Sequence, residues 1–202
     1  MPRLFRRLAR ADTVLFRRVA RSHAPLLDRL LPELSRAADF SKLWLAISAL
    51  LALAGGPSGK RAAARGLASL AVTSALVNAL LKPLLGRTRP AIEKVPRARR
   101  LARLPKSTSL PSGHAASASA FATGVALELP SSAPLIGPLA GTVALSRIYT
   151  GVHYPSDVAL GALVGAGVAL LSRVPWPTVP AAGEQADRSS QTSGVEASGR
   201  RS

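Results

Sequence analysis

The sequence predicts an all-α integral membrane bundle of about five, or six, transmembrane helices with an amphipathic helix at its N-terminus. Hydrophobic residues make up 48% of the 202 residues, whereas 18% are charged and 4% are aromatic. Of the 27 Lys and Arg, ten lie in residues 1–42 and nine in residues 82–106, which border long apolar runs. Basic residues in such positions are typical of segments that flank membrane spans.

Residues 1–37 form a basic segment with helical periodicity. Its apolar positions are Leu4, Leu8, Ala11, Leu15 and Val19, and arginines fill the other faces. This pattern predicts an amphipathic helix that lies in the membrane interface. A second set of leucines between residues 26 and 34 is interrupted at Pro32, where we expect a break. His23 lies in this segment and is assigned no role.

Residues 38–174 form the predicted transmembrane domain. Its apolar spans are residues 43–56, 66–85, 113–129, 133–149 and 158–174. The first span is shorter than the roughly 20 residues that a bilayer core requires. The polar sequence from Pro57 to Arg61 predicts a turn between the first two spans. Residues 175–202 are rich in Pro, Ser, Gly, Gln and Glu, which predicts a disordered polar tail.

Gly161 and Gly165 lie four residues apart in the last span. Small residues at this spacing allow helices to approach closely in lipid. General use of Ala and Gly in this part of the chain explains the pair equally well.

Three polar stretches lie at the ends of these spans, at residues 82–90, 111–114 and 146–157. Because five spans alternate across the membrane, all three stretches fall on the same side. The sequence therefore predicts one shared site at that face.

The residues of the first two stretches suit an anionic tetrahedral group. Lys82 and Arg89 supply positive charge. A simpler interpretation is that both are cations at the end of a membrane span whose side chains reach the interface. Ser112, Gly113 and His114 place a hydroxyl, an unhindered backbone N–H and an imidazole at a helix N-terminus, which favours phosphate. Ser112 alone is equally explained as a helix cap.

The third stretch adds Arg147, whose planar fork can bind two phosphate oxygens. It also holds His153 and Asp157, which are four residues apart. At that spacing they can face each other across a helix turn, with the carboxylate fixing one imidazole tautomer. The alternative is that Ser156 or Asp157 caps the next helix and His153 is a loop residue.

Composition excludes several other classes of site. The chain has no Cys, so a disulfide framework, a thiolate metal site and a Cys nucleophile are all absent. Residues 43–174 contain three acidic residues, Glu93, Glu128 and Asp157, too few for a two-metal phosphatase centre. The net charge of +17 could indicate nucleic-acid binding, but its position beside apolar spans favours anionic lipid.

Together the three stretches resemble the signature of the phosphatidic acid phosphatase type 2 and vanadium haloperoxidase superfamily. The resemblance lies in Lys82 followed by six residues and Arg89-Pro90, in Pro111-Ser-Gly-His114, and in Ser146-Arg147 with His153 and Asp157 at the family's spacing. It covers about residues 43–174. One apolar span lies wholly before the first motif, whereas many membrane members have two.

The resemblance implies a lipid-phosphate phosphatase that needs no metal or cofactor. His153 would be the nucleophile, Asp157 its orienting carboxylate and His114 the general acid. The implied phosphate-binding groups are those of Lys82, Arg89, Ser112, Gly113 and Arg147. Implied substrates are polyprenyl phosphates or diphosphates, phosphatidic acid, phosphatidylglycerol phosphate or a prenyl-linked phosphosugar.

Two other functions remain open on the sequence alone. A vanadium-dependent haloperoxidase would use the same pocket, although those relatives are typically soluble and larger. A non-catalytic, basic, membrane-bound protein would bind lipid or nucleic acid through residues 1–37. We expect a multi-pass protein of the cell membrane with lipid partners and no nucleic-acid partner. The basic residues favour a cytoplasmic site, whereas many relatives face outward, and the oligomeric state stays open.

Overall fold

The structure, a computed structural model, describes residues 2–22, 24–102, 104–105 and 107–172. The side chains of residues 2–8, His23 and the predicted tail lie outside the described part. All regular elements within that part are helical, as predicted.

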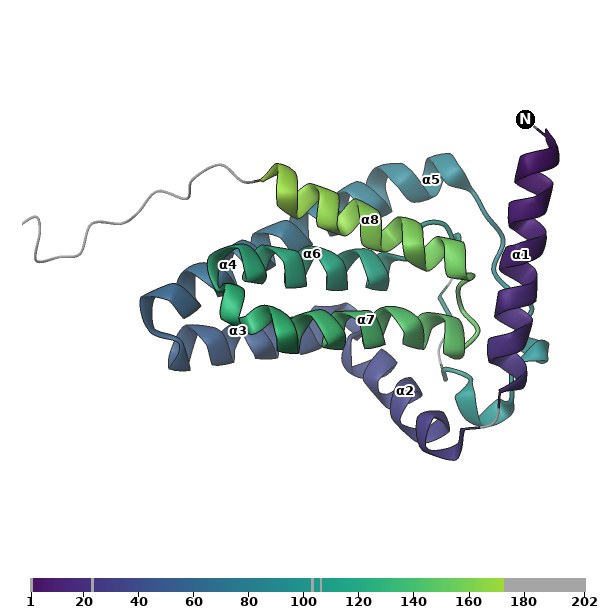
Figure 1. Ribbon diagram of the computed structural model, residues 1–202, viewed down its shortest axis with the longest axis horizontal. Coiled ribbons are helices and arrows are strands. Elements are labelled where there is room, and N and C mark those ends of the chain that lie inside the picture. Colours follow the sequence, from purple (N-terminus) through teal and green to yellow (C-terminus); the bar gives the residue numbers. More distant parts are fainter. Residues whose placement is uncertain (1, 23, 103, 106, 173–202) are drawn as a thin grey trace, which may run out of the picture. The chain divides into compact units, whose positions relative to one another are not determined.

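Five helical segments lie along one another and form the bundle (Figure 1). They are α3 (Lys42–Ala54), α4 (Gly56–Ala75), α6 (Gly113–Glu128), α7 (Ala133–Tyr149) and α8 (Pro155–Leu171). α4 continues through a π-helical stretch, Leu76–Leu81, into the short helix α5 (Lys82–Leu85). These segments correspond to the five predicted apolar spans, with ends that differ by a few residues in all but one case.

The start of α4 is the largest difference from the prediction. Residues 57–61 were expected to form a polar turn, but they lie in the first turns of the helix. Pro57 fits there because backbone N–H groups in the first turn of a helix make no intrahelical hydrogen bond, so the missing N–H of proline costs nothing. Gly59 packs directly on α3, since a Cβ at this position would lie 2.1 Å from the Leu51 carbonyl oxygen. The reversal between α3 and α4 therefore takes place at Gly55 and Gly56.

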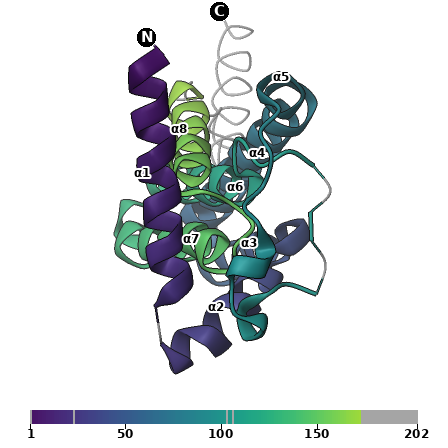
Figure 2. The ribbon, with the colours of Figure 1, turned by 90° about the vertical axis from the view of Figure 1, so that its right-hand side faces the viewer.

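Two helices precede the bundle, α1 (Pro2–Arg21) and α2 (Pro25–Ala37). The expected break at Pro32 is wrong, because this residue is buried inside a continuous α2. α1 crosses one end of the bundle, near the start of α8 and the end of α7 (Figure 2). Phe16 and Ala20 on α1 are buried in a cluster with Ile148 and Val158. The side of α1 that carries Phe16 and Ala20 thus packs on the protein, while Leu15, one of the predicted apolar positions, is exposed, as is Val14.

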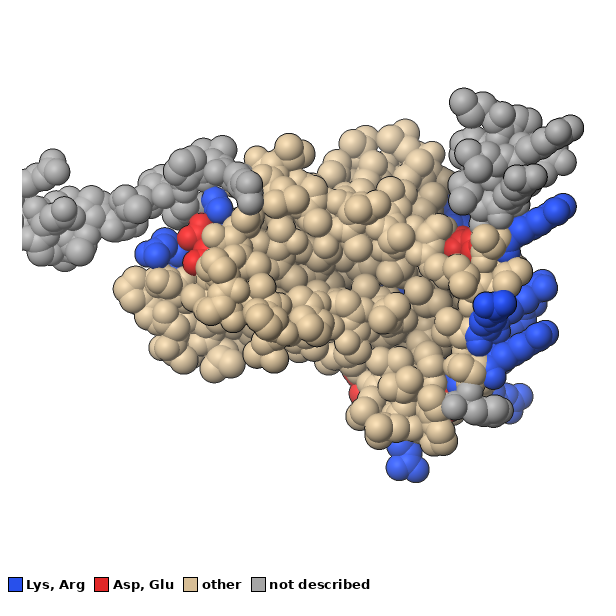
Figure 3. All heavy atoms as spheres, in the orientation of Figure 1, with Lys and Arg blue, Asp and Glu red and all other residues tan. Residues whose placement is uncertain are grey.

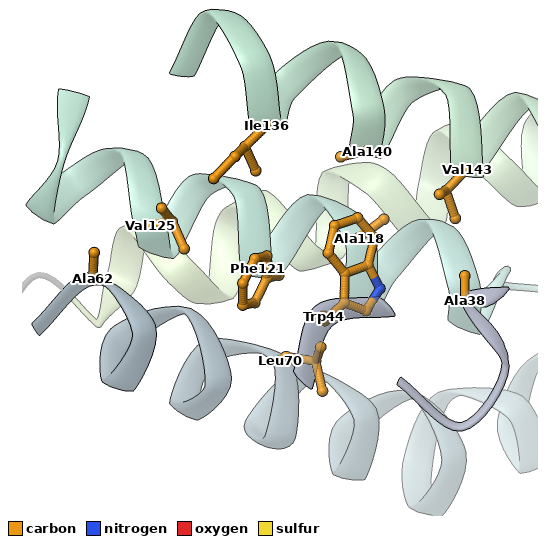
Figure 4. Packing of buried hydrophobic residues seen from close by; sticks show 10 residues of the cluster. All are labelled: Ala38, Trp44, Ala62, Leu70, Ala118, Phe121, Val125, Ile136, Ala140 and Val143. Carbon is orange, nitrogen blue, oxygen red and sulfur yellow. The ribbon is translucent and has the colours of Figure 1, made fainter. Parts of the chain in front are cut away.

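The core lies around α6, which packs against α4, α7 and α8. Most of its residues are small, and this allows the neighbouring backbones to come close. Trp44 and Phe121 fill the space between α3, α4 and α6, with ring centroids 5.1 Å apart (Figure 4).

The backbones of α6 and α8 also approach each other closely. A Cβ at Gly161 would lie 2.4 Å from the Ser112 carbonyl oxygen, and one at Gly165 would lie 2.1 Å from that of Ala116. Both glycines are thus needed for close helix contact. The backbone N–H of Ser112 also donates to the Asp157 carbonyl oxygen, at 2.9 Å.

Among the described residues, one helix is long and apolar enough to cross a bilayer, the continuous segment Gly56–Leu85. The helical segments Pro25–Ala37 and Asp39–Ala54, which meet at 65°, would together make a second. α8 is apolar but shorter. The count of five spans therefore stays a prediction.

Candidate functional site

The predicted site residues come together at the end of the bundle that α1 crosses. Lys82 lies at the end of the long α4–α5 helix, Ser112 to His114 at the start of α6, Arg147 near the end of α7, and His153 and Asp157 around the start of α8. Direct contacts link the three motifs.

His153 lies in the loop before α8 and is 2% exposed. Its Nε2 is 3.1 Å from Arg89 Nη1, and its Nδ1 is 3.6 Å from Asp157 Oδ2. Because a guanidinium can only donate, Nε2 must carry the lone pair and Nδ1 the proton. Burial lowers the pKa of His153 to about 4; Asp157 opposes this effect, and Arg89 and Arg147 add to it. The ring is therefore neutral near pH 7, with a free electron pair on Nε2.

Asp157 has two roles that were expected as alternatives. It is fully buried and occupies the first turn of α8, where its Oδ2 accepts the Tyr154 N–H at 2.8 Å. The same oxygen faces the His153 ring. His153 precedes the helix, so the pair meets across the helix N-terminus and not across a turn within α8.

Arg87, which lies inside the first motif, connects Asp157 to α1. Its Nη1 is 2.8 Å from Asp157 Oδ1 and its Nη2 is 2.6 Å from Asp12 Oδ2. Asp12 is buried on α1 and also accepts the Ser156 N–H at 2.9 Å. The catalytic carboxylate candidate is thus held by a chain of charged contacts that begins in the N-terminal segment.

Replacing Asp12 by Asn is expected to lower kcat/KM, for the activity that the sequence motifs imply, about tenfold and to lower the thermal midpoint. The substitution keeps the shape of the side chain but leaves Arg87 without one of its two carboxylates, a loss of about 2 kcal/mol for a partly buried pair. Arg10→Gln, at an exposed position on the same helix, is the matched control and should change neither value. Unaltered activity in the Asp12→Asn protein would show that α1 does not support the site.

The first motif forms a loop that is tied to residues 107–109. Arg89 donates from Nε to the Ser107 carbonyl at 2.9 Å and from Nη1 to the Val152 carbonyl at 2.7 Å. Lys82 Nζ lies 3.0 Å from Asn78 Oδ1 and 3.2 Å from Ser107 Oγ. It also lies against Gly113, where a Cβ would be 3.5 Å from the ammonium nitrogen. Both cations are therefore fixed beside the second and third motifs.

Arg147 is 1% exposed, and its Nη1 donates to Ser35 on α2. Its Nε is buried and has no hydrogen-bond partner. A buried guanidinium N–H without an acceptor is costly. The unpaired Nε–H of Arg147 is therefore a donor that an anionic ligand could accept from.

The second motif begins α6. Ser112 is fully buried and its Oγ accepts the Ala115 N–H at 3.4 Å, so it caps the helix, as the simpler interpretation had it. His114 follows in the first turn. Its Nε2 is 2.8 Å from Oδ1 of Asp39, a residue of the short 3₁₀ segment Asp39–Ser41 between α2 and α3.

A cavity of about 200 Å³ opens beside His114, Gly113 and Lys82. The rest of its wall comes from α3, the end of the α4–α5 helix and the 38–41 segment, and includes Trp44 and Asn78. The cavity therefore gives access to the histidine and the lysine from one side of the bundle. Among the described residues, no group of three or more His, Asp or Glu is placed to hold a metal ion.

Sequence reasoning missed four residues of the site, namely Asp12, Ser35, Asp39 and Arg87. Three of them, Asp12, Ser35 and Asp39, precede α3 and lie far from the motifs in sequence. One feature of the sequence could have indicated the role of Asp12, which is the single acidic residue among the arginines of residues 1–27.

The chain belongs to the PAP2 superfamily, whose profile matches residues 63–178. This match, which covers more than half of the chain, confirms the family predicted from the three motifs. The chain is also similar to the crystal structure of LpxE from Aquifex aeolicus, with a TM-score of 0.62 and 26% identity over 79% of this chain and 92% of that one. A PAP2-type phosphatidylglycerolphosphate phosphatase from Bacillus subtilis shares the fold, with a TM-score of 0.60 and 23% identity over 81% and 83% of the two chains.

Curated relatives match over a shorter region. The chain is 50% identical over 66 residues to the decaprenylphosphoryl-5-phosphoribose phosphatase of Mycobacterium tuberculosis, which is 32% of this chain and 35% of that protein. It is 41% identical over 69 residues to the undecaprenyl-diphosphatase of Sulfolobus acidocaldarius, or 34% of each. The matched regions thus span about a third of these relatives.

Proposed function

We propose that the protein is an integral membrane lipid-phosphate phosphatase that works without a metal through a phosphohistidine intermediate. The observation that carries the proposal is the neutral His153, which is held between Asp157 and Arg89 beside a set of buried cations. An uncharged imidazole with its lone pair fixed on Nε2 is a competent nucleophile toward phosphorus.

In the first step, the Nε2 lone pair attacks phosphorus and the bond from phosphorus to the leaving oxygen breaks. The ring becomes positive, and Asp157 stabilises this charge through the Nδ1 proton. His114 gives its proton to the leaving oxygen as general acid. In the second step, water attacks the phosphohistidine, His114 takes a proton from that water, and phosphate leaves with His153 regenerated.

Lys82, Arg89 and Arg147 would bind the phosphoryl oxygens, together with the backbone N–H groups at the start of α6. These donors are already in place, so they stabilise the charge that grows on the equatorial oxygens with little reorganisation. They supply the positive charge that a metal ion provides in other phosphatases. Arg89 would exchange its contact with His153 Nε2 for a phosphate oxygen when substrate binds.

The surface supports placement in a membrane. On the face shown in Figure 3, Lys and Arg gather at the end crossed by α1, a smaller charged group lies at the opposite end, and the surface between them is uncharged. Arg61 and Arg65 pair with Glu128 at that opposite end. Large apolar side chains are exposed along the sides of the bundle, among them Leu53, Leu135 and Leu163. This pattern suits five spans that tilt little, with residues 175–202 as a polar tail.

The N-terminal segment would lie at the membrane face that holds the site. The basic residues among residues 1–42 and 82–106 would then be at that face too, and the positive-inside rule would favour the cytoplasmic side.

Prenyl lipids are the favoured substrates. The two relatives described above are named for a decaprenyl phosphosugar and for undecaprenyl diphosphate. The cavity at His114 is lined on one side by polar residues, Ser74, Asn78 and Ser117. A hydroxylated leaving group such as a sugar fits this wall better than a plain acyl chain would.

The test is phosphate release by detergent-purified protein from a panel of lipid phosphates, in the presence of EDTA. We expect release from prenyl phosphates, prenyl diphosphates or a prenyl phosphosugar, and none from the His153→Ala protein. Release that stops with EDTA would contradict the metal-free mechanism. Release that continues in the His153→Ala protein would contradict the role of the histidine.

A further inference from the structure

The contact between Asp39 and His114 joins two residues 75 positions apart. His114 is three-quarters buried at the start of α6, and Asp39 sits at the corner between α2 and α3. Its neighbours Ala38, Phe40 and Ser41 line the same cavity as His114. Asp39 therefore contacts the ring beside this cavity.

The backbone at this corner adopts an unusual conformation that brings the carboxylate there. Phe40 and Ser41 have φ values of 54° and 60°, so two successive non-glycine residues are in the left-handed region. Such conformations are rare for residues with a Cβ and persist where the surrounding structure imposes them. The 65° bend between the two helices is made at this point.

The charges around His114 show why a carboxylate is needed. A general acid must carry a proton, yet the cation Lys82 lines the same cavity as His114, and a nearby cation disfavours a proton on an imidazole. The carboxylate of Asp39, 2.8 Å from His114 Nε2, favours one. The cations that bind phosphate therefore work against the general acid, and Asp39 opposes them. Its oxygen also fixes the ring, since a carboxylate can only accept and Nε2 must be the donor.

We infer that Asp39 is a positioning residue for the reaction, which orients His114 and keeps it protonated so that it can act on the leaving oxygen. This inference rests on the proposed function. The site then contains two His–Asp pairs with opposite tasks. The buried Asp157 serves the nucleophile, and the more exposed Asp39 serves the acid.

The experiment compares leaving groups. Asp39→Asn keeps the size of the side chain and removes its charge, and Glu33→Gln removes a charge from the nearby α2, where Glu33 pairs with Arg36 at the surface. Each protein is assayed for kcat/KM with p-nitrophenyl phosphate and with a short-chain phosphatidic acid. kcat/KM reports the steps up to phosphoryl transfer to His153, so hydrolysis of the intermediate does not affect the comparison.

For the Asp39→Asn protein we expect a loss of about 50-fold with phosphatidic acid, because an alkoxide leaves poorly without a proton. The loss with p-nitrophenyl phosphate should be less than about fivefold, because nitrophenolate needs no proton to leave. The Glu33→Gln protein should match the wild type with both. His114→Asn should likewise lower kcat/KM more with phosphatidic acid than with p-nitrophenyl phosphate. The double variant Asp39→Asn/His114→Asn should lose no more kcat/KM than His114→Asn alone.

Equal losses on both substrates would overturn the inference, since they would indicate a general effect on the site or on phosphate binding. No loss would overturn it as well. A wild-type protein that hydrolyses neither substrate, nor any lipid of the panel, would instead contradict the proposed function. Thermal melting in detergent verifies that each variant is folded, and Asp39→Glu should recover part of the lost rate with phosphatidic acid.

Discussion

Replacing His153 by Asn is expected to abolish phosphate release, with kcat lowered by at least about 10⁴-fold. The reason is that the amide has no nucleophilic nitrogen, while Arg89 and Asp157 keep their places around it. Labelled substrate, quenched during turnover, should leave a phosphoryl group on His153 of the wild-type protein that is labile in acid and stable in alkali. The His153→Asn protein should carry no label.

His114→Asn provides the matched control. It lacks the general acid but keeps the nucleophile, so p-nitrophenyl phosphate should still label His153. Because the pKa of His153 is about 4, the nucleophile is unprotonated through the neutral range. The kcat/KM should then fall as the pH decreases through about 4, provided that the protein stays folded. Label on another residue would contradict the proposed nucleophile.

Replacing Arg147 by Lys is expected to lower kcat/KM about 100-fold, the loss of one well-placed donor to the transition state. A lysine keeps the positive charge but lacks the planar fork and the Nε donor. The measurement is steady-state kinetics on the best lipid substrate, together with the thermal midpoint.

Arg99 makes a matched control because it is the other fully buried arginine among the described residues. Its donors are occupied by Asp28, at 2.6 Å from Nε, and by the Val19 carbonyl, at 3.0 Å from Nη1. Its guanidinium also lies 4.2 Å from the centroid of the Tyr149 ring. Arg99→Lys should therefore lower the thermal midpoint and leave kcat/KM within about threefold. If both variants lose activity equally, Arg147 has a structural role only.

The contrast between these two arginines also shows what the sequence alone can predict. Arg147 could be proposed as a site residue because it belongs to a motif of fixed spacing. Arg99 lies in the basic residues 82–106, and no motif distinguishes it from its neighbours there. Its burial depends on Asp28 and on carbonyls of α1, which no local pattern records.

The residues of the N-terminal segment could not be predicted for a related reason. Helical periodicity shows which residues share a face, but it does not show what that face meets. Phe16 lies outside the predicted apolar face of α1, and it packs against α7 and α8, whereas Leu15 of that face is exposed. Asp12, Ser35 and Asp39 reach the site only because α1 and α2 fold back across the end of the bundle. The helices of the bundle were easier to predict from the sequence, since each is a long apolar run between polar residues.

The glycine contacts between α6 and α8 have a consequence for how the protein can change over evolutionary time. The Ser112 and Ala116 carbonyls lie against Gly161 and Gly165. Main-chain atoms therefore set the distance between the start of α6, which carries His114, and the start of α8, which follows His153. Side chains on the outside of the bundle, such as Leu135 and Leu163, take no part in that separation. Sequence drift on the outer surface can therefore adapt the chain to lipids of different length and saturation without altering the geometry of the reaction.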